Sequence, residues 1–130
     1  MIWDRVAPLY DLAVNALNRR VYDGTGGAVA RLIHPGDTVL ECACGPGAIS
    51  AAIAPACARV VATDYSEGML KQARKKLAKH SNVTVEQADI TDLRYANDSF
   101  DAVVAGNVIH LLPEPGDALK ELKRVVRPGG

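Results

Sequence analysis

The first residues that could do chemistry occupy positions 41–47, where an acid is followed by small and turn-forming residues (Glu-Cys-Ala-Cys-Gly-Pro-Gly). Gly45 and Gly47 permit positive φ angles and let a ligand approach the backbone closely. A helix that starts after such a turn presents free backbone N–H groups to a carboxylate. A bound amino-acid group would therefore place its carboxylate at these donors and its ammonium near Glu41. The alternative is that residues 45–47 only form a tight turn.

Two further acids follow predicted strands and could bind a nucleoside. Asp64 comes directly after a buried strand, where a carboxylate can accept hydrogen bonds from both hydroxyl groups of a ribose. Its alternative role is a favourable charge at the start of the next helix. Asp89 could accept from an exocyclic amine while Ile90 covers a ring face, or Asp89 could be a surface turn residue. Met69 could pack against an adenine, although a helical methionine is more often part of the core.

These residues lie between elements that alternate along the chain, strand then helix. Short apolar runs predict buried strands, and apolar residues at three- and four-residue steps predict helices. The predicted strands are 38–42, 59–63, 83–87 and 100–105, and the predicted helices are 48–54, 67–79 and 117–126. Ser66 is the expected N-cap of the second helix. This order predicts an α/β, Rossmann-like domain with a parallel sheet, which brings the carboxyl ends of the strands and the acids after them to one edge.

The remaining chain and its composition fit one domain. Residues 1–34 carry helical patterning and are expected to lie as a cap over the mouth of the site, with 35–130 forming the core. The formal net charge of zero gives no general attraction to nucleic acid or to an anionic membrane. No apolar run reaches the roughly 18 residues that span a bilayer. Three cysteines, an odd number, argue against a disulfide framework, so we expect reduced thiols in a cytoplasmic protein.

Other candidate residues have ordinary explanations. His110 lies near the expected mouth of the site and could be a general base, but the favoured interpretation is that it gives the site its shape or partners a helix end. The basic residues of helix 67–79 are expected to form a solvated face, since a nucleic-acid surface would need aromatic residues among them. The glycine spacing at 45–47 lacks the third glycine of a dinucleotide fingerprint, which argues against a nicotinamide-dependent dehydrogenase.

Taken in series, these motifs resemble those of the class I S-adenosylmethionine-dependent methyltransferases. Residues 39–47 look like the first motif of that family, Asp64 like its ribose-binding acid, 88–90 like its adenine motif and 100–104 like its fourth strand. Residues 3–11 are similar to the start of small-molecule methyltransferases, including those of quinone biosynthesis. The resemblance implies S-adenosylmethionine as cofactor, S-adenosylhomocysteine as product and no metal. The cofactor-binding residues that it implies are Tyr10, Glu41, Ala43, Gly45, Gly47, Asp64, Tyr65, Met69, Asp89, Ile90 and Asn107.

The resemblance also implies a strand order of 3-2-1-4 with helices on both faces, and it shows three departures. Ala43 stands where the family usually has glycine, and Glu41 replaces the commoner aspartate. The family's sheet has about seven strands, whereas this chain offers four, so we expect an incomplete class I methyltransferase fold. The function expected is methyl transfer to a small-molecule acceptor. The alternatives are a catalytically incomplete cofactor-binding fragment and, as a weaker candidate, the dehydrogenase.

The fourth predicted strand would be an edge of such a four-stranded sheet. Its residues 102–105 (Ala-Val-Val-Ala) are apolar on both faces and include neither lysine nor proline, so they lack the devices that usually protect an edge. A large exposed apolar patch often marks an interface. We therefore expect a homodimer formed through this strand and the last helix.

Overall fold

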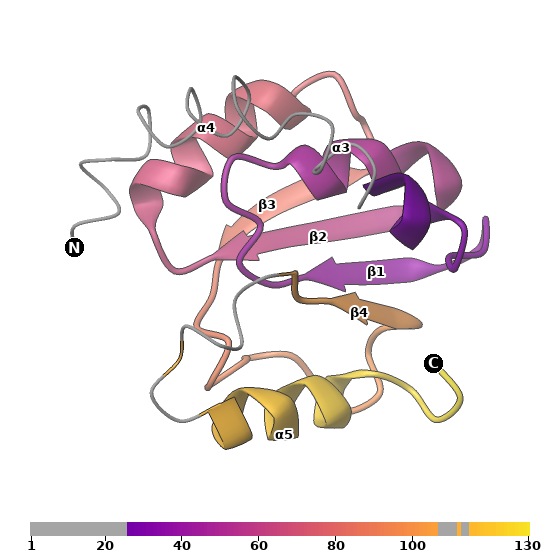
Figure 1. Cartoon of the computed structure of the whole chain (residues 1–130), viewed down its shortest axis with the longest axis vertical. Coiled ribbons are helices and arrows are strands. Elements are labelled where there is room, and N and C mark those ends of the chain that lie inside the picture. Colours follow the sequence, from indigo (N-terminus) through magenta and orange to yellow (C-terminus); the bar gives the residue numbers. More distant parts are fainter. Residues whose placement is uncertain (1–25, 107–111, 113–114) are drawn as a thin grey trace.

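Four parallel strands form a single sheet in the part of the chain that the computed structural model describes, residues 26–106, 112 and 115–130. The strands are β1 (Thr38–Glu41), β2 (Arg59–Asp64), β3 (Val83–Gln87) and β4 (Ala102–Val104). Their order across the sheet is β3-β2-β1-β4 (Figure 1). The predicted fold class and strand order are therefore confirmed.

The register of the sheet brings the candidate site residues to one edge. Glu41 at the end of β1 pairs with Ala62, and Asp64 at the end of β2 pairs with Gln87 at the end of β3. The chain keeps this arrangement beyond the strands, because the backbone N–H of Ala88 donates to the carbonyl of Asp64 at 3.1 Å. The carboxyl ends of β1, β2 and β3 thus lie side by side.

Helices cover both faces of the sheet (Figure 1). One face carries α3 (Ala48–Ile53) and α4 (Glu67–Leu77), and the other carries α5 (Pro115–Val125). A 3-10 turn (Ala54–Ala56) follows α3 because Pro55 cannot continue the helical hydrogen bonding. The hydroxyl of Ser66 accepts the backbone N–H of Met69 at 3.2 Å, which confirms the predicted N-cap of α4.

Two hydrophobic clusters lie on either side of the sheet. The first joins α3 and α4 to β1 and β2 through residues such as Ile53, Leu70, Val39 and Val60. The second joins α5 to the opposite face through Leu40, Val61, Phe100 and Val125. The apolar residues of β1 alternate between the two clusters, as expected of a strand that is buried on both faces.

Some element boundaries differ from the predicted ones. The strand predicted at 100–105 is regular only over Ala102–Val104, because Phe100 forms an isolated bridge with Val126. Asp101, between Phe100 and β4, contacts β1 through its backbone N–H, which donates to the carbonyl of Thr38 at 2.9 Å. Its carboxylate accepts the backbone N–H of Thr38 at 2.8 Å and the side chain of Arg127 at 2.6 Å. A short helical stretch at 26–30 precedes β1, whereas residues 1–25 of the predicted cap lie outside the described residues. Among the described helices, none is long and apolar enough to cross a membrane.

Candidate ligand-binding site

The turn after β1 is built from residues with left-handed backbone conformations. Ala43, Gly45 and Gly47 have φ angles of 55°, 55° and 98°. The turn is fixed to the neighbouring strand, since the backbone N–H of Cys44 donates to the carbonyl of Thr63 at 2.8 Å. Glycine adopts such angles without a steric penalty, whereas alanine does not.

The two glycines of this turn serve different purposes. A Cβ atom added to Gly47 would lie 3.0 Å from Cδ1 of Leu77 and 3.6 Å from Cα of Ala73, so this glycine lets α4 pack closely. A Cβ atom added to Gly45 would meet no atom within 4 Å. The space beside Gly45 is therefore open to a ligand that approaches the backbone.

Asp64 organises the same turn. Its two carboxylate oxygens accept the backbone N–H groups of Gly45 and Ser66, both at 2.9 Å. Each carboxylate oxygen has two acceptor positions, so one remains on each oxygen for a further donor. Asp64 is half-buried, and its place between the turn and the start of α4 suits two adjacent hydroxyl groups.

Glu41 is the most deeply buried acid described at this edge, with 2% of its surface exposed. Its carboxylate accepts a hydrogen bond from the hydroxyl of Ser50 in α3, and its backbone carbonyl accepts the hydroxyl of Thr63 at 2.9 Å. The pKa of Glu41 rises from 4.5 to about 8, and burial is the main cause. Interaction with Ser50 lowers this pKa, whereas the negative charge of Asp64 raises it further. Glu41 is therefore an acid that keeps its proton at neutral pH until a cation favours its ionised form.

The segment after β3 carries Asp89 in an exposed turn. One oxygen of its carboxylate accepts the backbone N–H and the hydroxyl of Thr91, at 2.9 and 2.7 Å. The same segment is held from α5, where Arg124 donates to the carbonyls of Leu93 and Tyr95, both at 2.7 Å, and Glu121 accepts the backbone N–H of Leu93 at 2.9 Å. Asp89 therefore lies in a surface turn, and its second oxygen has no partner among the described residues, so its role in ligand binding stays a prediction.

The remaining predicted site residues fall in three groups. Ile90 is half-buried against the α5 cluster, and Met69 is buried, with 5% of its surface exposed. Tyr65, at 58% exposure, lies next to Asp64 and its carbonyl accepts the side chain of Gln87 at 3.0 Å. Tyr10, Asn107 and His110 lie outside the described residues. Their roles, like those of the whole set, stay predictions.

Two residues at this edge were not singled out from the sequence. Ser50 and Thr63 are both buried, and both donate hydroxyl hydrogen bonds to Glu41. A polar residue at an inward position of a predicted helix or strand is the signal that could have found them, because buried hydroxyl groups need partners.

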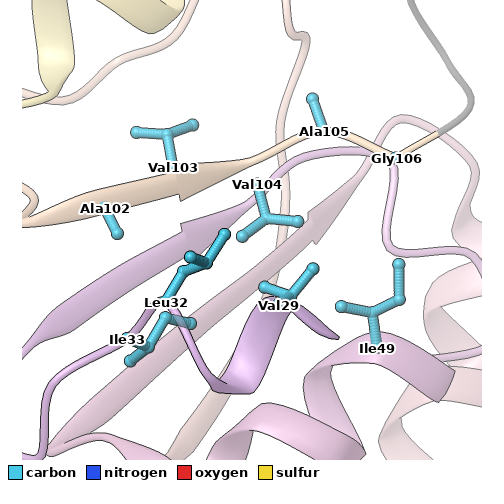
Figure 2. Close-up of a pocket in the computed structure, with 9 residues that line it drawn as sticks. All are labelled: Val29, Leu32, Ile33, Ile49, Ala102, Val103, Val104, Ala105 and Gly106. Atoms are coloured by element: carbon cyan, nitrogen blue, oxygen red, sulfur yellow. The ribbon is translucent and has the colours of Figure 1, made fainter. Parts of the chain in front are cut away.

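An apolar cavity of about 350 Å³ lies beside β4, and every residue that lines it is apolar. Figure 2 shows Ala102 and Val104 pointing to the side on which Val29, Leu32 and Ile33 lie, while Val103 and Ala105 point to the other side. The lining residues are Val29, Leu32, Ile33, Ile49, Ala102, Val103, Val104, Ala105 and Gly106. The cavity runs along β4, and its end at Ile49 and Gly106 reaches the carboxyl edge of the sheet, because Ile49 belongs to the helix that follows the glycine turn.

The three cysteines are free and buried. Burial raises the pKa of the Cys42 thiol to about 12 and that of Cys44 still further. These thiols are therefore protonated at neutral pH, and they act as small core residues rather than as nucleophiles.

Substitution of Ala43 by glycine should stabilise the protein. The φ angle of 55° at Ala43 costs an L-residue roughly 1–2 kcal/mol, whereas glycine loses about 0.4–1 kcal/mol through its more flexible unfolded state. We expect Ala43→Gly to raise the free energy of unfolding by about 0.5–1 kcal/mol in urea denaturation. The matched control, Ala51→Gly within α3, should instead lower it by a similar amount. Destabilisation by both variants would contradict the assigned strain at Ala43.

A family model described as a methyltransferase domain matches residues 40–130. The chain is 45% identical over 105 residues to a demethylmenaquinone methyltransferase of Clavibacter sepedonicus, covering 79% of this chain and 43% of that protein. It is 35% identical over 134 residues to a ubiquinone/menaquinone biosynthesis C-methyltransferase of Bdellovibrio bacteriovorus, covering 99% of this chain and 57% of that protein. The fold is similar to a SAM-dependent methyltransferase from Aquifex aeolicus, with a TM-score of 0.68, 28% identity, and coverage of 79% and 58%. The chain thus spans about half the length of these relatives.

Proposed function

Because this chain belongs to the methyltransferase-domain family, we propose that it binds S-adenosylmethionine at the carboxyl edge of its sheet and transfers the methyl group to a small-molecule acceptor. The observation that carries the proposal is the convergence at that edge of Glu41, Asp64 and Asp89 with the open backbone of Gly45. Each of these features matches one part of the cofactor. Glu41 matches the ammonium, Asp64 the two ribose hydroxyls and Asp89 the adenine amine, and the open backbone of Gly45 matches a part of the ligand that must approach closely.

The residues of the site would bind and orient the cofactor. Glu41 would face the ammonium, Asp64 would use its two remaining acceptor positions for the ribose hydroxyls, and the free oxygen of Asp89 would accept from the adenine amine. The cofactor supplies an electrophilic methyl group, so the chain needs no nucleophile of its own. Its contribution is to align the acceptor and to exclude water, which can supply about 7–11 kcal/mol of the barrier.

The apolar cavity beside β4 supports an acceptor with a substantial apolar part. Its lining from Val29 to Gly106 offers only carbon-rich side chains and backbone, and such cavities favour ligands that bury apolar surface. Two relatives named above are methyltransferases of quinone biosynthesis, and an aromatic acceptor of that kind fits a cavity of this lining. We place the protein in the cytoplasm, where its buried cysteines stay reduced.

Titration calorimetry tests the cofactor proposal. We expect the chain to bind S-adenosylhomocysteine with a micromolar or tighter Kd and to give no heat with NAD under the same conditions, because the glycine turn lacks the dinucleotide spacing. Binding of NAD in preference to S-adenosylhomocysteine would refute the proposal. Turnover with a panel of quinone-like acceptors then separates an active methyltransferase from a chain that binds the cofactor without turnover.

A further inference from the structure

Ser50 is a buried hydroxyl in direct contact with the buried acid of the site. It has no exposed surface, and its Oγ donates a hydrogen bond to Oε1 of Glu41. We propose that Ser50 is a positioning residue that holds the Glu41 carboxylate ready for the ammonium group of the bound cofactor, an inference that rests on the proposed function.

The backbone around Glu41 is fixed independently of Ser50. The hydroxyl of Thr63 donates to the carbonyl of Glu41 at 2.9 Å, and the carbonyl of Thr63 accepts the N–H of Cys44 at 2.8 Å. These two bonds hold the end of β1 and the following turn against β2. The contact with Ser50 therefore acts on the side chain of Glu41, and it ties that side chain to α3.

The groups around Glu41 make its ionised form costly. Burial is the largest cause, Asp64 at the end of β2 adds a negative charge, and the neutral thiols of Cys42 and Cys44 follow β1 in the turn. Against these, the hydroxyl of Ser50 donates to the carboxylate and, together with the nearby backbone N–H of Ser50, lowers the pKa of Glu41. Removal of the hydroxyl leaves Glu41 protonated over a wider pH range, and a protonated acid offers no charge to an ammonium.

Calorimetric titration with S-adenosylhomocysteine between pH 6 and 9.5 tests the role of Ser50. For Ser50→Ala we expect binding about tenfold weaker than the parent at pH 7 and nearly equal at pH 9.5, because the pH profile moves up by about one unit. Ser50→Cys keeps the volume but is a weak donor, so its profile should fall between the two. The control Ser81→Ala, in an exposed turn before β3 at the opposite edge of the sheet, should follow the parent.

Two outcomes would overturn the role of Ser50. One is a loss of affinity of equal size at every pH, which would mean that the hydroxyl only fastens α3 to β1. The other is a pH profile of S-adenosylhomocysteine affinity that is the same as the parent's, measured in Ser50→Ala or, if that variant does not fold, in Ser50→Cys. Titration of the ligand's own amine cancels in these comparisons, since it is common to all variants. Failure of the parent chain to bind at any pH would instead refute the proposed cofactor site.

Discussion

Replacement of Glu41 by glutamine should change the pH dependence of stability. The free energy of unfolding of Glu41→Gln, compared with that of the parent, should rise markedly from acidic to alkaline pH. The pKa of Glu41 is 4.5 in its ordinary state and about 8 in the fold, so the folded chain holds a proton that the unfolded chain releases in this range. The stability that protonated Glu41 contributes is therefore complete below pH 4.5, and it is lost as the pH rises towards 8. At about 1.36 kcal/mol per pH unit, the fall reaches up to roughly 5 kcal/mol in the parent, and Glu41→Gln has no proton to lose.

Urea denaturation of parent and variant at several pH values between 4.5 and 9 measures this difference. The control is Glu67→Gln at the exposed start of α4, where Glu67 pairs with Arg74 at 3.6 Å. An exposed ion pair contributes at most about 1 kcal/mol, so the control should follow the parent curve. A constant gap between parent and Glu41→Gln across the pH range would show that Glu41 does not keep its proton in the fold.

The same energetics relate stability to ligand binding at Glu41. An acid that is held protonated by burial is costly to the empty protein once the pH exceeds the ordinary pKa of that acid, 4.5 for Glu41. An ammonium beside it lowers that cost, because the opposite charge favours the ionised form. The instability at Glu41 is thus concentrated where the proposed ligand can remove it, as strained or unfavourable groups often are at functional sites.

The sequence was sufficient for the elements and their succession along the chain because those depend on local patterns, whereas the order of the strands across the sheet came from the family resemblance. Alternation of short apolar runs with helical periodicity predicted the strands and the parallel sheet, and Ser66 before an amphipathic helix predicted the N-cap of that helix. The start of β4 was predicted less well, since Phe100 pairs with Val126, a residue that lies far from it in sequence.

The contacts that shape the candidate site depend on tertiary packing, which the sequence does not show. Ser50 appears in the sequence as one small residue of a short helix, and only the packing of α3 on β1 brings it to Glu41. Arg124 appears as an exposed cation of an amphipathic helix, yet it holds the segment after β3 through two carbonyls. The positive φ of Ala43 is also a property of the folded turn, although its place among glycines indicated it.

Asp64→Ala should cause a large loss of cofactor affinity. The variant removes the acceptor proposed for both ribose hydroxyls, and hydrogen bonds to a charged group contribute about 1.5–3 kcal/mol. This corresponds to binding of S-adenosylhomocysteine that is about 10- to 150-fold weaker. The N–H groups of Gly45 and Ser66 also lose their partner, so the turn beside the ligand loosens as well.

Two further variants separate the effect on the ligand from the effect on the turn. Asp64→Asn keeps one carbonyl oxygen as an acceptor but loses the charge, so we expect its affinity to lie between those of the parent and Asp64→Ala. Asp92→Ala removes an exposed acid that pairs with Arg94 at 3.6 Å with both side chains largely in solvent, and it should bind as the parent does. Calorimetry at pH 8 measures all four proteins. Unchanged affinity in Asp64→Ala would exclude Asp64 as the ribose acceptor. Equal losses of affinity in Asp64→Ala and Asp92→Ala would show that the loss comes from removing a negative charge and not from removing a specific acceptor.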